Sequence, residues 1–586
     1  MGNRCQFNFL NQHKMKKLNI LTTLMLFCGL VSCELDRIPE TTLTENAFWK
    51  TEEDFSGAAA YLVRLTPGLS QDYRADEMID SESSNSISNG SRTVPSTSSD
   101  WSTPYKSIYY SNTILYQASK CQTLSEENLK KYVAEAKFYR AANYFTLMKK
   151  YGGVPLLLTP TLSTKDTTIT KDRATRLQVM EQILSDLEYA KDNLPGIDEA
   201  TWGHPSVSAA QGMIVRVCLY QGTYDKFHAG TNRVTGEDYK RWLNLAIDAA
   251  EDMIEDQEHD LFSSYGNTLF RFGGEGRQNR ENIWVKVYGP YNFGGDASGV
   301  NYNNDLFGKF GNTRGLTRNI ADLYLYKDGL PRSKSAYAKK QETSYDDMFV
   351  DRDPRLEQIL FKLGQMSYRE GHVPFTTNRS TFSLGVKKYY DHAENQAEGD
   401  KCSVDHMLMR YAEILISYAE ALYERDGAIS DEVLDMTINR LHERAGFDFR
   451  LTNAHVTANG LDMREEIRRE RTVEFVHEMF RYDDLIRWKE AENALPKSLY
   501  GALYGDNDGN GVSRSSVASR LTDADGKARD RRGRKVQVCD QADVYVLEFS
   551  TDRKFDPEKD YLYPIPLDEI TLSGHSVQDF QNPGWF

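Results

Sequence analysis

Amphipathic segments recur along most of this chain, and this recurrence constrains the fold more than any other feature of the sequence. Over residues 129–151 the apolar side chains are spaced three or four apart, which places them on one helix face: Ala134, Phe138, Ala141 and Phe145. Similar spacing predicts further helices over 48–65, 105–118, 177–194, 206–224, 239–254, 408–423, 433–444 and 463–492, and the last is expected to be the longest.

These helices follow one another in pairs, and small residues such as Ala209, Ala210 and Gly212 occur where two backbones would have to approach closely. This style of packing is typical of tetratricopeptide helix pairs, although no strict repeat of about 34 residues is visible. Between 258 and 400 the periodicity ends, and the sequence becomes rich in Gly, Asn and Tyr with short apolar runs such as 283–285. We therefore predict a mainly α fold with an inserted loop-rich region that contains short strands.

The same observations predict how the chain is divided. Residues 48–257 form a first helical part, and residues 258–586 form a second part that carries the inserted loops, the two making one compact unit. A polar stretch over 66–104 has little apolar periodicity and is expected to be a functional or a disordered loop. A second irregular region, rich in Gly, Asp and Arg, covers 501–560.

The N-terminal segment has the pattern of an export signal that ends in a lipid attachment site. Met15 is followed by two lysines, then by an apolar run over 18–30, and the run closes with the sequence Leu-Val-Ser-Cys that ends at Cys33. We expect Met15 to be the true start, residues 1–32 to be removed, and Cys33 to carry the lipid at the head of a polar tether over 33–47. The apolar run is shorter than the roughly 20 residues that cross a bilayer. A plain secretory signal is the alternative.

Charge and cysteine content exclude several classes of function. The net charge of -15 argues against a nucleic-acid ligand, because an acidic surface repels phosphate groups. After removal of the signal and lipidation of Cys33, four widely spaced cysteines remain, and none belongs to a CxxC motif: Cys121, Cys218, Cys402 and Cys539. We expect free thiols, mostly buried, rather than a disulfide framework or a zinc site.

Several segments resemble the SusD/RagB family in a shared order along the chain. The run EAKFYRAANYFTL over 135–147 is followed by YGGVPL over 151–156, and Asp353-Pro-Arg355 comes later. The most specific block is RER over 469–471 with EF at 474–475, then RYDDL over 481–485 and RW at 487–488. YPIP over 563–566 and QNPGW over 581–585 complete the match, which covers essentially the whole mature chain.

This resemblance implies a specific architecture and role. The body would contain four tetratricopeptide-like helix pairs, and the protein would be a lipoprotein on the outer surface of the outer membrane. Its partner would be a SusC-like, TonB-dependent β-barrel transporter, to which it delivers captured oligosaccharides without catalysis. A peptide-capturing lid, as in RagB-like relatives, is the alternative, and a lid that gates the barrel with negligible affinity of its own is another.

A sugar site needs aromatic faces and planar hydrogen-bonding groups, and two irregular regions supply both. By position they resemble the family's ligand-binding loops, although these loops vary widely between relatives. The first region contributes Arg74, Asp76, Asp80 and Trp101, and the second contributes Tyr288, Tyr291 and Tyr302. Packing of the loops, or contact with the transporter, is the other interpretation of these residues.

The remaining motifs are interpreted as structural. The charged residues of the 469–488 block, with Arg444, Asp353 and Arg355, are expected to form ion pairs that dock a helix on its neighbours. The stretch DNDGNG over 506–511 imitates half of a calcium loop, but Val517 stands where a bidentate Glu is needed, so we predict no metal and no cofactor. Motifs of hydrolases and metalloproteases are absent, and an exported glycoside hydrolase stays a remote alternative.

Overall fold

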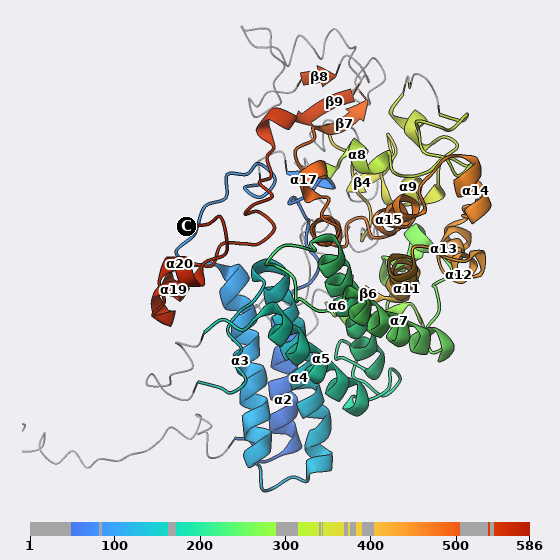
Figure 1. The fold of residues 1–586 in the computed structure, drawn as a ribbon. Helices are drawn as coiled ribbons and strands as arrows, with labels where there is room; N and C mark the ends of the chain where they lie inside the picture. The colour runs from blue at the N-terminus through green and yellow to red at the C-terminus, as the bar shows by residue number, and fades with distance from the viewer. Residues whose placement is uncertain are drawn as a thin grey trace, which may run out of the picture.

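The computed structural model describes residues 48–80, 85–161, 172–288, 314–338, 342, 344–368, 373–374, 382–389, 404–503, 537–539 and 544–586. About half of this part is helical and its sheets are small, which confirms the predicted mainly α class (Figure 1). Cys33, the tether over 33–47, Tyr291, Tyr302 and the acidic turns over 506–511 lie outside the described residues.

The first half of the chain supplies the long helices of the body. They are α2 (Glu52–Leu65), α3 (Ser99–Lys120), α4 (Glu126–Tyr151), α5 (Arg176–Asn193), α6 (Val207–Phe227) and α7 (Tyr239–Glu255), and α11 (Tyr411–Asp426) joins them from the second half. Consecutive helices pack on one another: α3 on α4, α4 on α5, and α6 on α7, which α11 then covers (Figure 1).

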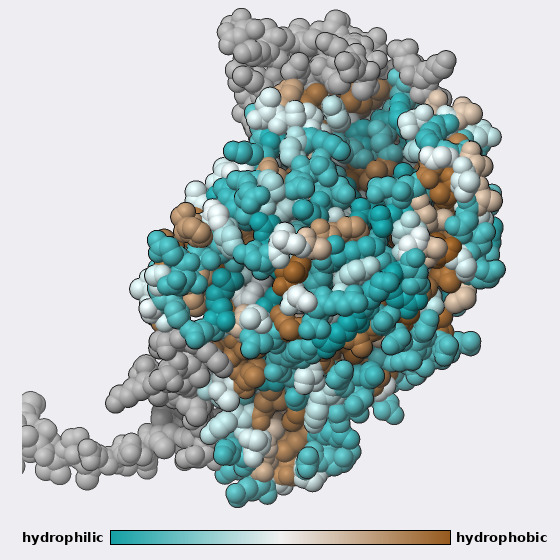
Figure 2. All heavy atoms as spheres, viewed as in Figure 1, coloured by the Kyte–Doolittle hydropathy of each residue, from teal (hydrophilic) through white to brown (hydrophobic). Residues whose placement is uncertain are grey.

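Helix α4 illustrates how the sequence pattern becomes a buried face. All four residues whose spacing predicted this helix are at most 4% exposed, within a core that runs through the helical body. The helix ends where predicted, at Gly152, whose φ of 73° is a conformation that residues with a Cβ rarely adopt. The face in Figure 2 is mostly hydrophilic with small hydrophobic patches, because the apolar side chains lie inside.

The helices of the second half of the chain are mostly short, and a second core lies among some of them. They are α8 (Arg318–Ala321), α9 (Pro354–Ile359), α12 (Asp431–Met436), α13 (Ile438–Ala445), α14 (Asn453–Ala458), α15 (Met463–Glu474), α16 (Arg481–Arg487), α17 (Ala491–Ala494), α19 (Leu567–Ser573) and α20 (Val577–Phe580). This core is separate from that of the helical body and contains residues such as Tyr265, Leu356 and Tyr389.

The strands are short and antiparallel, and short strands were predicted only for the region between 258 and 400. They are β1 (Met78–Asp80), β2 (Asn282–Lys286), β3 (Arg314–Leu316), β4 (Met366–Tyr368), β5 (Val373–Pro374), β6 (His406–Arg410), β7 (Leu499–Leu503), β8 (Gln537–Cys539) and β9 (Val544–Glu548). Within the described residues β1 pairs with β3, β2 with β6, β4 with β5, and β9 lies between β7 and β8. The predicted strand at 283–285 is confirmed as the buried β2.

The expectation of one long helix over 463–492 is wrong, and α4 is the longest helix in the described part of the chain. Helix α15 ends at Glu474, and a turn with positive φ at His477 and Met479 leads into α16. At the break, backbone carbonyl oxygens accept hydrogen bonds from a side chain instead of from the N–H groups of a further helical turn. Lys388 Nζ lies 3.3 Å from Glu474 O and 2.8 Å from Val476 O. We call residues 475–480 the α15–α16 turn.

Three other boundaries differ from the sequence prediction. The expected helix over 433–444 is divided at Thr437, whose ψ of -93° is not helical, and residues 408–410 belong to strand β6 instead of a helix. Helix α3 starts at Ser99 rather than near 105, because the Ser98 hydroxyl accepts a hydrogen bond from the Asp100 N–H at 3.2 Å. Trp101 therefore lies in the first turn of a helix and not in a loop.

Two further observations bear on the predicted export and thiol chemistry. Among the described helices, none has both the length and the apolar composition that a membrane crossing requires. Cys218 is a buried free thiol, as predicted, and Cys121 is a free thiol that is only partly buried. Cys402 and the side chain of Cys539 lie outside what the structure describes.

Candidate functional site

A cleft of about 330 Å³ opens between α4 and α6, and this volume lies in the range of small-molecule sites. Its other walls are the segment 66–74, which we call the strap, strands β2 and β6, and the α15–α16 turn with α16. We call it the α4–α6 cleft. It is lined by Thr66, Pro67, Gly68, Leu69, Arg74, Tyr139, Ala142, Asn143, Phe145, Thr146, Lys149, Lys150, Met213, Arg216, Leu219, Tyr220, Trp284, Leu408, Arg471, Glu478, Met479, Phe480, Asp483, Asp484 and Arg487.

Aromatic rings form much of the apolar wall of the cleft. Phe145 on α4 meets Tyr220 on α6 edge to face, with 5.5 Å between ring centroids. Trp284 projects from β2 and is packed against Phe138 at 5.0 Å. Phe480 is only half-buried and lies at the end of the α15–α16 turn. Of these rings, Phe480 has the most accessible face for stacking on the C–H side of a sugar, because Phe145, Tyr220 and Trp284 are only 4–7% exposed.

Polar groups converge on the same cleft from separate elements. The Arg74 guanidinium donates to both oxygens of Asp72, at 2.8 and 2.7 Å, and lies over the Tyr482 ring at 4.5 Å. Lys149 on α4 bonds Asp483 on α16. Burial would raise the pKa of Asp483, but Lys149 and Arg74 outweigh it and hold that pKa below its usual range. Asp483 is therefore an ionised acceptor at neutral pH.

The strap and the residues that follow it are attached to the α15–α16 turn and to β6. Leu69 N–H donates to His406 Nδ1 at 2.9 Å, and Ser70 N–H points at the Met479 sulfur at 3.2 Å. Burial lowers the pKa of His406 to about 3, so this ring is a neutral acceptor. Three residues beyond the strap, the Glu77 carboxyl accepts a hydrogen bond from His477 N–H, and burial raises the pKa of Glu77 to about 8.

The sequence-predicted residues occupy different environments. Arg74 lines the cleft, and Tyr288 lies beside the strap, where a Cβ at Gly68 would collide with its hydroxyl. Asp76 is buried in an ion pair with Arg481, at 2.8 and 2.9 Å. Asp80 is buried in β1, opposite β3.

Trp101 is the predicted residue that the structure separates most clearly from the cleft. It is 4% exposed, and its ring packs on Tyr151 at 4.9 Å and on Tyr105 at 5.1 Å. A ring covered in this way has little face left for a sugar, so Trp101 is the least suited of the described candidates. Ligand contact by any of these residues stays a prediction.

Several cleft residues were interpreted from the sequence only as packing residues or were not singled out. Phe480 and Asp483 belong to the charged block that was expected to dock a helix, and Trp284 belongs to a short apolar strand. Tyr220 and Arg216 lie on a helix with a small-residue face, where Tyr220 is buried and Arg216 is half-buried. No local pattern marks them, because they meet only when three distant segments come together.

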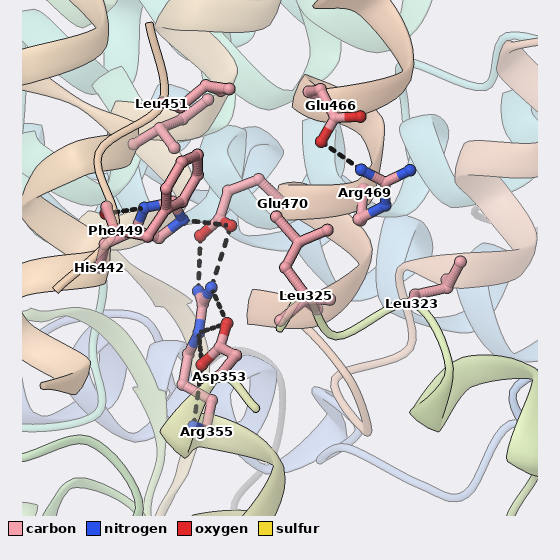
Figure 3. A pocket seen from close by; sticks show the side chains of 12 residues that line it. Leu323, Leu325, Asp353, Arg355, His442, Phe449, Leu451, Glu466, Arg469 and Glu470 are labelled. Carbon is pink, nitrogen blue, oxygen red and sulfur yellow. Dashed lines mark hydrogen bonds and ion pairs between the residues drawn. The ribbon is translucent and has the colours of Figure 1, made fainter. Parts of the chain in front are cut away.

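The expected ion pairs of the 469–488 block are confirmed, and they lie inside the protein (Figure 3). Arg355 on α9 bonds Asp353, Glu470 and Glu474, while Arg410 bonds Glu474 at 2.7 Å. Arg444 reaches Glu281 at 2.8 Å and also contacts Glu474. The cavity beside Glu470 in Figure 3 is only about 10 Å³, room for a single water at most, so this cluster is structural.

Metal binding finds no support in the part of the chain that the structure describes, where no three His, Cys, Asp or Glu residues are grouped to hold an ion. The acidic turns over 506–511 and 523–526 lie outside it.

Together, the paired helices, the small inserted sheets and the cleft define a mainly helical protein with a ligand-sized site between its layers. The chain belongs to the SusD family, whose sequence model matches residues 279–585. A second model, described as starch-binding associating with outer membrane, matches residues 53–219.

Relatives of known name agree with this assignment. The chain is 25% identical to SusD-like protein P38 of Formosa agariphila, over 82% of this chain and 93% of that protein. It is 24% identical to a SusD-like protein of Bacteroides ovatus, over 88% of each.

Solved structures show the same fold. A SusD-like carbohydrate binding protein from Bacteroides fragilis superimposes with a TM-score of 0.68 at 20% identity, over 90% of this chain and 99% of that one. A structure described as containing a xylogluco-oligosaccharide superimposes with a TM-score of 0.56 at 18% identity, over 90% of this chain and 96% of that one.

Proposed function

We propose that this protein binds oligosaccharides non-catalytically in the α4–α6 cleft and delivers them to a SusC-like, TonB-dependent transporter of the outer membrane. The observation that carries the proposal is the combination, in one cleft, of the half-buried Phe480 ring and several buried aromatic rings with the charged groups of Arg74, Lys149 and Asp483. Membership of the SusD family, and the carbohydrate-binding description of a structural relative, support this class of ligand.

Anchoring by a lipid on Cys33 completes the proposal. Several acyl chains would hold the protein stably at the membrane, since each buried CH₂ contributes about 0.8 kcal/mol. The tether over 33–47 would keep the protein at high effective concentration near its transporter while allowing it to move. Cys33→Ser should release the protein from the membrane fraction, and mass spectrometry of the wild type should find acyl chains on Cys33. Wild-type protein without acyl chains would reject the anchor.

Binding is tested with the chain from residue 34 onward against panels of polysaccharides and of mixed peptides. We expect retention by one class of glycan and no release of reducing ends from it. Phe480→Ala should then weaken binding at least tenfold, about 1.4 kcal/mol, because a stacking face is lost. Tyr109→Ala is the matched control, since Tyr109 is an exposed aromatic outside the cleft lining.

Each other result has a defined meaning. Retention by peptides alone would replace oligosaccharides by peptides as the ligand. Equal glycan affinity in the Phe480→Ala variant and the wild type would place the site outside this cleft. Release of reducing ends would contradict a purely binding role. Delivery is tested separately, by isolating the lipidated protein from outer membranes and identifying whether a TonB-dependent barrel accompanies it.

A further inference from the structure

We propose that the ligand of the α4–α6 cleft is an anionic oligosaccharide that carries carboxylate or sulfate groups. This inference rests on the proposed function and adds the charge of the ligand to it. It starts from a contrast: the chain as a whole has a net charge of -15, yet the charged groups accessible in this cleft are mostly cationic.

The cleft lining contains six cationic side chains and three carboxylates. Two of the cations, Arg471 and Arg487, are themselves buried and bond buried carboxylates, so they are not accessible to a ligand. The other four have side chains that are 18–22% exposed: Arg74, Lys149, Lys150 and Arg216. These four come from the strap, from α4 and from α6, so they approach the cleft from three directions.

The carboxylates of the lining are much less accessible. Glu478 and Asp484 are 2% and 4% exposed and are bonded to buried cations. Asp483 is the one lining carboxylate with appreciable exposure, at 21%. A ligand entering the cleft therefore meets four cationic groups and one carboxylate from its lining.

The carboxylates that balance two of the accessible cations lie behind them. Asp72, the partner of Arg74, is 4% exposed, and Glu413, the partner of Arg216, is 2% exposed. Lys150 pairs instead with Asp100, which is 46% exposed and is not among the lining residues. Because Coulomb energy falls with distance, an anionic ligand near the guanidinium groups is attracted by them more strongly than it is repelled by the buried carboxylates behind them.

Hydrogen-bond donors are also available to such a ligand. Arg216 uses Nε and Nη2 for Glu413 and for the Leu408 carbonyl, and its Nη1 has no hydrogen bond among the described residues. Arg74 Nη1 has two long contacts, 3.5 Å to the Tyr563 hydroxyl and 3.9 Å to Asp483 Oδ1. Guanidinium groups with free N–H donors bind carboxylate and sulfate oxygens with charge-assisted bonds.

The test compares three oligosaccharides of equal length by titration calorimetry on the protein from residue 34 onward. They are tetragalacturonate, which has carboxylates, its fully methyl-esterified form, which is neutral, and a sulfated galactan tetrasaccharide. We expect the ester to bind at least tenfold more weakly than the better of the two acidic ligands. We also expect this preference to shrink as salt rises from about 50 to about 500 mM, because the charges are partly exposed.

Two double variants locate the effect. Lys149→Gln with Lys150→Gln removes two accessible cations from the C-terminal end of α4 and should weaken acidic binding at least tenfold, a larger loss than the same variant causes for the neutral ester. The control is Lys130→Gln with Lys131→Gln, which makes the same change at the exposed N-terminal end of the same helix, and should leave both affinities unchanged. Thermal melting verifies that each variant is folded.

The outcomes separate this inference from the function on which it rests. Binding by the carboxylate ligand or by the sulfated one supports the inference and identifies the charged group. Equal binding of acid and ester, with both weakened by Phe480→Ala, overturns the inference and leaves the proposed function standing. An equal loss of acidic binding in both double variants also overturns it. If no glycan of any charge binds, the proposed function fails as well.

Discussion

Arg355 and Glu470 lie 115 residues apart and form a buried two-pronged ion pair, with Nη1 2.5 Å from Oε1 and Nη2 3.0 Å from Oε2. The side chains are 1% and 7% exposed, and this pair joins α9 to α15 (Figure 3). Because α15 leads directly into the turn that lines the cleft, the pair connects the stability of the second half of the chain to the geometry of the site.

Arg355→Met should destabilise the protein by about 3–5 kcal/mol, because it leaves buried carboxylates without their cation. Lys327→Gln is the control, since Lys327 pairs with Asp351 on the surface and is 50% exposed, and it should cost less than about 1 kcal/mol. Urea unfolding measures both. Similar midpoints for the two variants would show that the buried cluster contributes little.

Acid should unfold this protein through its buried carboxylates. Burial alone would raise the pKa values of Glu470 and Glu420. Arg355 and His442 instead lower the pKa of Glu470 to about 2. Arg487 and Arg471 lower the pKa of Glu420 to about 2. Their ordinary value is 4.5, so their contribution to stability is complete above that pH and is lost as pH falls from about 5 to about 2. Urea midpoints that stay constant from pH 6 to about 3 would contradict this prediction.

Glu77 should have the opposite effect. Burial raises its pKa to about 8, so its contribution to stability is complete below the ordinary value of 4.5 and declines as pH rises through 8. Glu77→Gln keeps an acceptor for His477 N–H and has no charge to desolvate. We expect the variant to melt at a higher temperature than the wild type at pH 8 and at the same temperature near pH 4. A lower melting temperature at pH 8 would refute this.

Gly222 should be required for the contact between α6 and α7. A Cβ there would lie 2.7 Å from Leu243 Cδ2 and 3.2 Å from Leu243 N, so Gly222→Val should destabilise by about 1–3 kcal/mol. Gly57→Ala is the matched control, because Gly57 lies within α2 with no atom near its missing Cβ. It should stabilise by roughly 0.5–1 kcal/mol. If the Gly222→Val variant had a higher denaturant midpoint than the wild type, as expected for Gly57→Ala, helix propensity would outweigh the close approach.

The sequence alone was sufficient for the fold class and for most of the helices. Helix α4 was predicted with its buried face and its end at Gly152, since periodicity and the terminal glycine are local properties. The family could also be recognised, because its motifs occur in a fixed order. The ion-pairing role of Glu470 was predicted too, from alternating charges on a helix, and the same role was predicted for Arg355.

What only the tertiary structure decided is where helices break and which side chains share a cleft. The segment 463–492 keeps a helical pattern, yet it breaks after Glu474 because Lys388 and Arg410, from distant segments, bond the carbonyls there. The cleft likewise combines Phe480, Arg216 and Trp284 from three separated segments. Contacts of this kind depend on how the whole chain packs, and sequence spacing records only what neighbours along the chain can do.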